Sequence, residues 1–127
     1  MGDFARLNVL SERIIGLAIE VHRHLGPGML ESTYQRCLCF ELEKHGLQFD
    51  TEVEVPLTYK ELEIERAYRA DLIVDKCVVV EIKSVETILP VHEAQLLTYL
   101  RLCKMKLGLL LNFNVPLLKN GIIRKIN

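Results

Sequence analysis

The sequence has no excess of positive charge. Its 127 residues include 16 lysines and arginines and 17 aspartates and glutamates, for a formal net charge of −1. Neutralisation of phosphates usually supplies much of the affinity for nucleic acids, so this balance counts against a protein that binds DNA or RNA through a broad basic surface. It does not exclude an enzyme that meets phosphate only at a metal site.

Cysteine pairs and long apolar runs are also lacking. None of the four cysteines stands in a C-x-x-C pair, so we expect free thiols in a reduced compartment and no zinc site. No apolar stretch is long enough to span a bilayer, and charges near the start interrupt any signal-peptide pattern. We therefore expect a cytoplasmic protein without membrane contact. The length predicts one domain over residues 1–127, with a loose segment at 1–10.

Hydrophobic periodicity predicts the order of the elements. Helical spacing alternates with strand spacing along the chain, and Ser11 is the expected N-cap of the first helix. The expected elements are helices at 11–25 and 29–45, two strands within 51–65, two strands within 68–83, a helix at 90–103, and strands at 106–113 and 122–126. This order predicts an α/β or α+β fold in which helices pack against a mixed sheet. The acidic hairpin within 51–65 is expected to be a solvated sheet face.

Charged residues within the stretch 68–83 need an explanation, because this stretch is otherwise rich in valine and isoleucine. A loop of two residues would place Asp71 opposite Val80, whereas a loop of three would place it opposite Glu81. Like charges directly opposite destabilise a sheet unless a divalent cation lies between them. We therefore predict an odd-numbered loop, with Asp71, Glu81 and Lys83 on one face. The alternative is a surface hairpin whose charged face is simply solvated.

Other polar residues fit structural interpretations as well as functional ones. Glu31 lies in the first turn of the second helix, where an acidic residue is favoured by the helix dipole. His92, Gln95 and Tyr99 form one stripe of a later helix, which is ordinary surface unless it faces the two hairpin acids. The apolar segment 109–123 is core or, alternatively, the interface of a homo-oligomer.

Four motifs follow one another along the chain. They are Gly28-x-x-Glu31-x-x-Tyr34, Asp71, Glu81-Ile82-Lys83 and Gln95-x-x-x-Tyr99. The last three resemble the PD-(D/E)xK nuclease superfamily, and the first matches the motif that names the GxxExxY proteins, a branch of that superfamily. The likeness covers residues 11–112. Ala70 stands where the superfamily motif has proline, and we expect Ala70 to face away from the site.

The resemblance implies a restriction-endonuclease-like core, in which a helix precedes a three-stranded meander, then a helix and a further strand. It also implies a metal site. Asp71 and Glu81 would ligate Mg²⁺, for which Mn²⁺ can substitute, with the backbone carbonyl of Ile82 nearby. Glu31 would be an additional ligand or water-holder, and Lys83 would orient or activate the attacking water.

The resemblance further implies a substrate and an activity. Gln95 and Tyr99, with His92 on the same stripe, would contact the phosphate backbone. The implied activity is Mg²⁺-dependent hydrolysis of phosphodiester bonds in nucleic acid, with DNA preferred to RNA as the partner. Two alternatives are a non-catalytic nucleic-acid-binding or accessory module that retains the nuclease fold, and a structural protein-interaction subunit.

Overall fold

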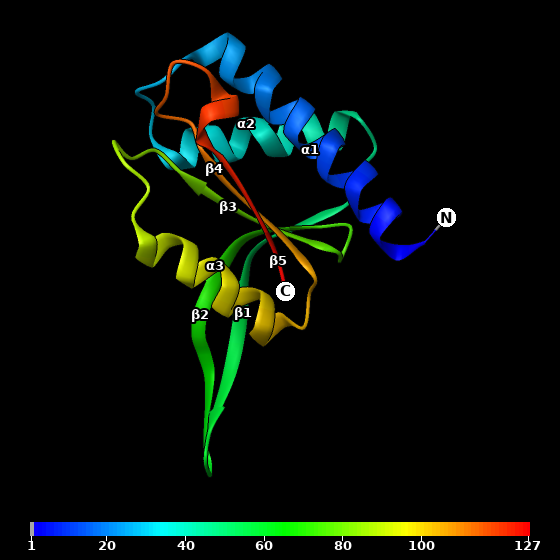
Figure 1. Ribbon diagram of the computed structural model, residues 1–127, viewed down its shortest axis with the longest axis vertical. Coiled ribbons are helices and arrows are strands. Elements are labelled where there is room, and N and C mark those ends of the chain that lie inside the picture. Colours follow the sequence, from blue (N-terminus) through cyan, green and yellow to red (C-terminus); the bar gives the residue numbers. More distant parts are fainter. Residues whose placement is uncertain (1) are drawn as a thin grey trace.

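Three α-helices and five strands make up the part of the chain that the structure, a computed structural model, describes, residues 2–127. Met1, part of the segment expected to be loose, lies outside it. The elements are α1 (Asp3–Leu25), α2 (Glu31–Lys44), β1 (Phe49–Tyr59), β2 (Leu62–Val74), β3 (Val78–Lys83), α3 (Pro90–Cys103), β4 (Leu107–Asn112), the short 3-10 helix η1 (Leu118–Gly121) and β5 (Ile122–Ile126). In Figure 1, α1 and α2 lie on one side of the sheet and α3 on the other. The predicted α/β fold, with helices flanking a mixed sheet, is confirmed.

The sheet has the strand order β1-β2-β3-β4-β5. The first three strands form an antiparallel meander, α3 carries the chain across to β4, which runs parallel to β3, and β5 returns antiparallel. A parallel pair needs such a crossover connection, and a helix is its usual form. This is the core arrangement that the resemblance implied.

The first helix starts earlier than expected. The segment 1–10 was predicted to be loose, but α1 begins at Asp3 and continues without a break through Ser11. Leu10 is buried and extends the apolar stripe of the helix toward its N-terminus, so packing holds this part of the chain helical. Ser11 is therefore not an N-cap, and its hydroxyl donates a hydrogen bond to the carbonyl of Asn8, 3.0 Å away.

Two expected strands are one. We predicted separate strands within 51–65 and 68–83 on either side of residues 66–67, but β2 runs continuously over 13 residues and pairs with β1 along most of its length. The pairing of β1 with β2 shifts register between Val55 and Leu57. We had interpreted the break in alternation near this point as the end of a strand, but it is an irregularity within one continuous strand. The sheet therefore has one strand fewer than the sequence predicted.

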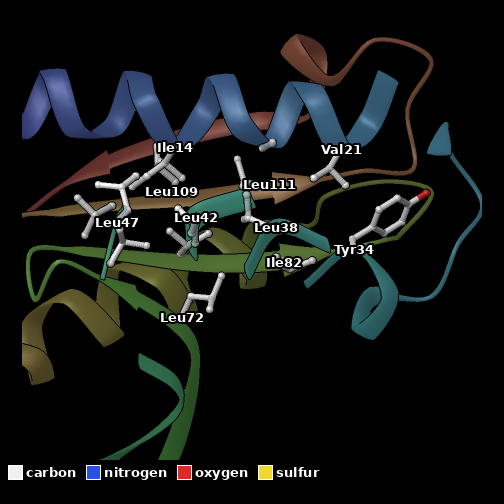
Figure 2. Packing of buried hydrophobic residues seen from close by; sticks show 14 of the residues in the cluster. Ile14, Val21, Tyr34, Leu38, Leu42, Leu47, Leu72, Ile82, Leu109 and Leu111 are labelled. Atoms are coloured by element: carbon white, nitrogen blue, oxygen red, sulfur yellow. The ribbon is translucent and has the colours of Figure 1, made fainter. Parts of the chain in front are cut away.

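The core lies on both faces of the central strands. One cluster packs α1 and α2 against the sheet, and Figure 2 shows Ile14, Leu38 and Leu109 within it and Tyr34 near one end. A smaller cluster packs α3 against the other face. Because β3 and β4 are covered on both sides, they read as nearly continuous apolar runs. Against this background a buried carboxylate, Glu81, is an exception that leads to the candidate site.

Candidate active site

The turn between β2 and β3 sets the register of the site. It consists of three residues, 75–77, which agrees with the odd-numbered loop that we predicted. The register pairs Val74 with Val78, Ile73 with Val79 and Leu72 with Val80. Continued by one step, it brings Asp71 opposite Glu81.

Two carboxylates replace the backbone ladder where β2 separates from β3. The N–H of Asp71 donates to Oε1 of Glu81, 3.4 Å away, and the N–H of Ile82 donates to Oδ2 of Asp71, 2.9 Å away. The Glu81 side chain thus binds the backbone of Asp71, and the Asp71 side chain binds the backbone of the residue that follows Glu81. This reciprocal arrangement holds the two acids together at the end of the central strand, as predicted for one face of the hairpin.

Burial sets the charge state of this pair. The Glu81 residue is only 6 % exposed, and burial, followed by the charge of Asp71 and the hydrogen bond between the two side chains, raises the pKa of Glu81 to about 9. Burial also raises the pKa of Asp71, although the N–H of Ile82 and the charge of Lys83 oppose the rise. At neutral pH the pair therefore retains a proton. A divalent cation could replace that proton, because it would offset both negative charges.

The third predicted acid lies elsewhere. Oε2 of Glu31 accepts a hydrogen bond from the N–H of Ser84, 3.0 Å away and directly after Lys83. Nowhere in residues 2–127 do three histidine, cysteine, aspartate or glutamate side chains gather closely enough to hold a metal ion. The expected convergence of three acids is therefore absent from this structure. The reason is that α2 packs on the face of the sheet that holds Ile82, whereas Glu81 alternates to the face that holds α3.

The remaining residues of the Glu81-Ile82-Lys83 motif occupy their expected faces. Lys83 follows Glu81 by two residues, so it shares its face, and its charge lowers the pKa of both Asp71 and Glu81. The Ile82 side chain is buried in the α1–α2 cluster, and its N–H is bound to Asp71. A metal contact by the Ile82 carbonyl stays a prediction.

A pair of stacked tyrosines borders the acids. Tyr99 of α3 stacks on Tyr68 of β2, with 11° between the ring planes. Burial, followed by the charges of Glu81 and Asp71, raises the pKa of Tyr99. Burial, followed by the charges of Cys103 and Glu81, raises the pKa of Tyr68. Tyr99 therefore faces the acids as the stripe required, and Tyr68 is a neighbour that we did not predict.

Among residues 2–127, the other two residues of the stripe form no hydrogen bond or ion pair with the acids. Nδ1 of His92 accepts a hydrogen bond from the N–H of Leu89, 2.9 Å away, and the N–H of His92 donates to the carbonyl of Leu89 at 2.9 Å. These bonds cap the start of α3, so His92 has a structural task. Gln95 is exposed on α3. The substrate-binding roles of His92 and Gln95 stay predictions.

Strand alternation breaks at Asp71, and this break shapes the site. Leu72 packs in the α1–α2 cluster, yet Ala70 packs with Leu96 in the α3 cluster. Our expectation that Ala70 faces away from the site was therefore wrong. The break coincides with an irregularity in the neighbouring strand, where Glu52, opposite Asp71, adopts a left-handed φ of 50°.

Glu52 and Gln35 support Asp71 from outside the predicted set. Nε2 of Gln35 donates to Oε1 of Glu52, 2.9 Å away, and to the carbonyl of Asp71, 3.3 Å away. Arg69 holds the other oxygen of Glu52 with Nε at 2.9 Å, and the charge of Glu52 adds to the raised pKa of Asp71. Glu52 is therefore part of the surroundings of the site and not merely a solvated residue of an acidic hairpin.

Two buried polar side chains anchor the loops beside the site. The Tyr34 hydroxyl donates to the carbonyl of Gly26 and accepts from the N–H of Met29. Asn112, at the end of β4, binds both backbone groups of Val85 through its side-chain amide, at 3.1 and 3.0 Å. The segment after Lys83 is thus held from α2 on one side and β4 on the other.

Comparison with known proteins identifies one family. A model of the PD-(D/E)XK nuclease superfamily matches residues 8–125, which include both acids, strands β1–β4 and all of β5 but its last residue. No curated protein and no solved structure matches the chain. Among the helices described for residues 2–127, none has the length and apolar character needed to cross a bilayer.

Proposed function

Because the chain belongs to the PD-(D/E)XK nuclease superfamily, we propose that it is a metal-dependent nuclease that hydrolyses phosphodiester bonds, with DNA preferred to RNA. The observation that carries the proposal is the buried Asp71–Glu81 pair, with Lys83 on the same face. We place the chain in the GxxExxY branch, and the roles of Glu31 and Tyr34 in holding the adjoining loops support that placement.

The donor set fits Mg²⁺. Carboxylate oxygens are the hard ligands that this ion prefers, and it usually takes only one or two of them and keeps several waters. Asp71 and Glu81 would supply those two, and the Ile82 carbonyl is the proposed further contact. When bound, the ion supplies a more acidic water and offsets charge on the phosphoryl oxygens. Mn²⁺ should substitute because it accepts the same ligands.

The protein residues around the acids have separate proposed tasks. Lys83 orients the attacking water and offsets phosphate charge as a point cation. Tyr99 lines the substrate side of the site, and Gln95 would contact the phosphate backbone. Glu31 positions the end of β3 through Ser84 in this structure. The role as additional ligand or water-holder that the resemblance implies would require Glu31 to release that N–H.

A second candidate is a non-catalytic module that keeps the nuclease fold. The absence of a third acid beside the pair in residues 2–127 favours it, as does the near-zero net charge. Metal binding separates the two functions. Millimolar Mg²⁺ should raise the melting temperature of the nuclease, since a ligand that binds only the folded state stabilises it. No heat and no shift in calorimetry would favour the module.

Cleavage assays test the proposal directly. Purified chain is incubated with labelled single- and double-stranded DNA and RNA, with Mg²⁺, Mn²⁺ or a chelator. We expect cleavage only with metal, its loss in Asp71→Ala, and a fall of about 10²–10³-fold in Lys83→Ala, as for removal of other transition-state charge. Glu43→Gln, an exposed change on α2, is the control. Full cleavage by Asp71→Ala would refute the assigned roles.

A further inference from the structure

Strands β1 and β2 extend beyond the rest of the molecule as a two-stranded arm (Figure 1). We define the arm as residues 56–66, all of which are exposed. None of them belongs to either of the two core clusters. The arm is therefore long for a hairpin that only has to complete the sheet, since isolated two-stranded hairpins gain little stability in water.

One face of the arm is apolar. The register pairs Leu57 with Ile64 and Tyr59 with Leu62. Residues directly opposite each other share a face, so these four side chains form one strip. Their exposed fractions are 37 % and 37 % for the first pair and 60 % and 58 % for the second. Exposed apolar side chains gathered in this way are a candidate interaction surface.

The other face of the same strand is acidic. Glu63 and Glu65 alternate with Leu62 and Ile64 along β2, so their side chains point to the opposite face, and Glu61 precedes them in the turn that joins the two strands. None of the three glutamates forms an ion pair with any residue in the described part of the chain. Both cations of the arm are already engaged.

Those two cations are Lys60 and Arg66. Nε of Arg66 lies 3.0 Å from a carboxylate oxygen of Glu54, and Nζ of Lys60 lies over the Tyr59 ring, 5.5 Å from its centroid. The acidic face of β2 therefore presents charge that the arm itself does not balance.

The edge of β2 is open along the arm. Its ladder with β3 begins at Leu72, so the side of residues 62–70 that faces away from β1 has no strand partner within residues 2–127. The outer edge of β1 is a poorer template, because Pro56 lacks an N–H. An unpaired edge is a ready template for an added strand.

We propose that the arm docks a segment of a partner protein that adds as a strand to the open edge of β2. The segment carries alternating apolar and basic side chains, so that its apolar side extends the strip of Leu62 and Ile64 and its basic side meets the three glutamates. Backbone hydrogen bonds supply affinity in such strand addition, and the alternating side chains supply specificity. The proposal goes beyond nuclease activity and does not depend on it.

The negative charge of the arm favours a basic partner strand over a second copy of the chain and over nucleic acid. A second copy of the chain, paired along the same edge, would set glutamates beside glutamates, which destabilises a sheet. Nucleic acid would bring phosphates to an acidic face. A basic strand removes both objections.

Peptide binding tests the proposal. The probe is a capped peptide of about nine residues, a usual strand length, that alternates lysine and valine. Amide shifts of the ¹⁵N-labelled chain are followed by NMR. We expect the shifted amides to cluster in residues 56–70. A peptide of equal composition with its lysines and valines in separate blocks should bind at least about tenfold more weakly, and alternating glutamate and valine should not bind.

Variants of matched charge complete the test. Reversing all three arm glutamates to lysine should weaken binding by about tenfold or more, as exposed pairs act together. The control reverses three exposed glutamates elsewhere, Glu12, Glu43 and Glu86, and should retain affinity within about twofold. The Asp71→Ala variant should bind like the wild type, which separates docking from catalysis.

Three results would overturn the proposal. One is amide shifts that lie outside residues 56–70. Another is equal binding by the block peptide or equal losses in both triple variants, because either shows general electrostatic attraction. The third is a free chain that sediments as a dimer with the arm amides protected from exchange, since a second copy would then cover the edge.

Discussion

Glu81 is a carboxyl group that folding removes from water at the end of a central strand. The N–H of Asp71 and the charge of Lys83 favour its ionised form, yet burial, followed by the charge of Asp71 and the hydrogen bond between the two side chains, raises the pKa of Glu81 to about 9. One proton neutralises only one of the two carboxylates, so the pair keeps one negative charge. A bound cation would offset this charge. Without metal, the pH dependence of stability should show that the folded pair retains a proton.

Without divalent cations, we expect stability to fall with pH across the window between the ordinary pKa of Glu81, 4.5, and its folded pKa of about 9. The folded chain binds more protons than the unfolded chain in this window, so rising pH favours unfolding. Thermal melts of the wild type should show the decline, and those of Glu81→Gln should lack that part of it. Equal slopes for the two proteins would contradict the assigned burial effect.

Glu31 allows a test that separates positioning from ligation. If its task is to accept the Ser84 N–H, Glu31→Gln should keep most of the cleavage activity, because the amide oxygen can accept the same bond. Glu31→Ala should lose about tenfold or more, a usual effect of removing an outer-shell partner. Metal affinity from calorimetry is the second readout. An equal loss of metal affinity in both variants would identify Glu31 as a ligand instead.

At the scale of elements, β2 shows which features of a strand can be predicted from sequence periodicity and which cannot. Side-chain alternation and turn length were enough to predict that Asp71 and Glu81 meet, because both rules act over a few neighbouring residues. The break in alternation at Asp71 was not predictable, since it coincides with a left-handed φ at Glu52 in another strand, which no local pattern signals. Tyr68 and Gln35 were missed because their contacts join segments that lie far apart in the sequence.

The loop before α2 gives the element-scale prediction. Tyr34 is fully buried, and its hydroxyl binds the backbone of Gly26 and Met29 at the turn between α1 and α2. Tyr34→Phe keeps the packing on Phe113 but removes both hydrogen bonds to this partly exposed turn, which should cost about 0.5–1.5 kcal/mol. Urea unfolding measures the loss. Tyr59→Phe, at an exposed ring, should be neutral, and equal losses would show that the turn bonds contribute nothing.

At the scale of the whole molecule, part of segment 109–123 is core. The sequence left it as core or as an oligomer interface. Leu109, Leu110, Leu111 and Leu118 are buried within the single chain, whereas Leu117 is 56 % exposed, so an oligomer interface there stays a prediction. The early start of α1 belongs to the same scale, since Leu10 is held helical by packing that local pattern does not reveal. Fold class followed from local periodicity and the arrangement of the core from the resemblance, whereas these packing outcomes depend on contacts between distant segments.

The arm and the body should be separable. Because residues 56–66 contribute no buried side chain to either cluster, replacing residues 57–64 by an Asn-Gly turn should leave the body folded. The free energy of unfolding should change by no more than about 0.5 kcal/mol, as for other surface changes, whereas Leu38→Ala in the core should lose about 2–5 kcal/mol. Urea unfolding and the metal-induced melting shift measure both. Collapse of the shortened chain would mean that the arm is needed to form the sheet; retention of stability and metal binding would mean that it is free to serve as a docking edge.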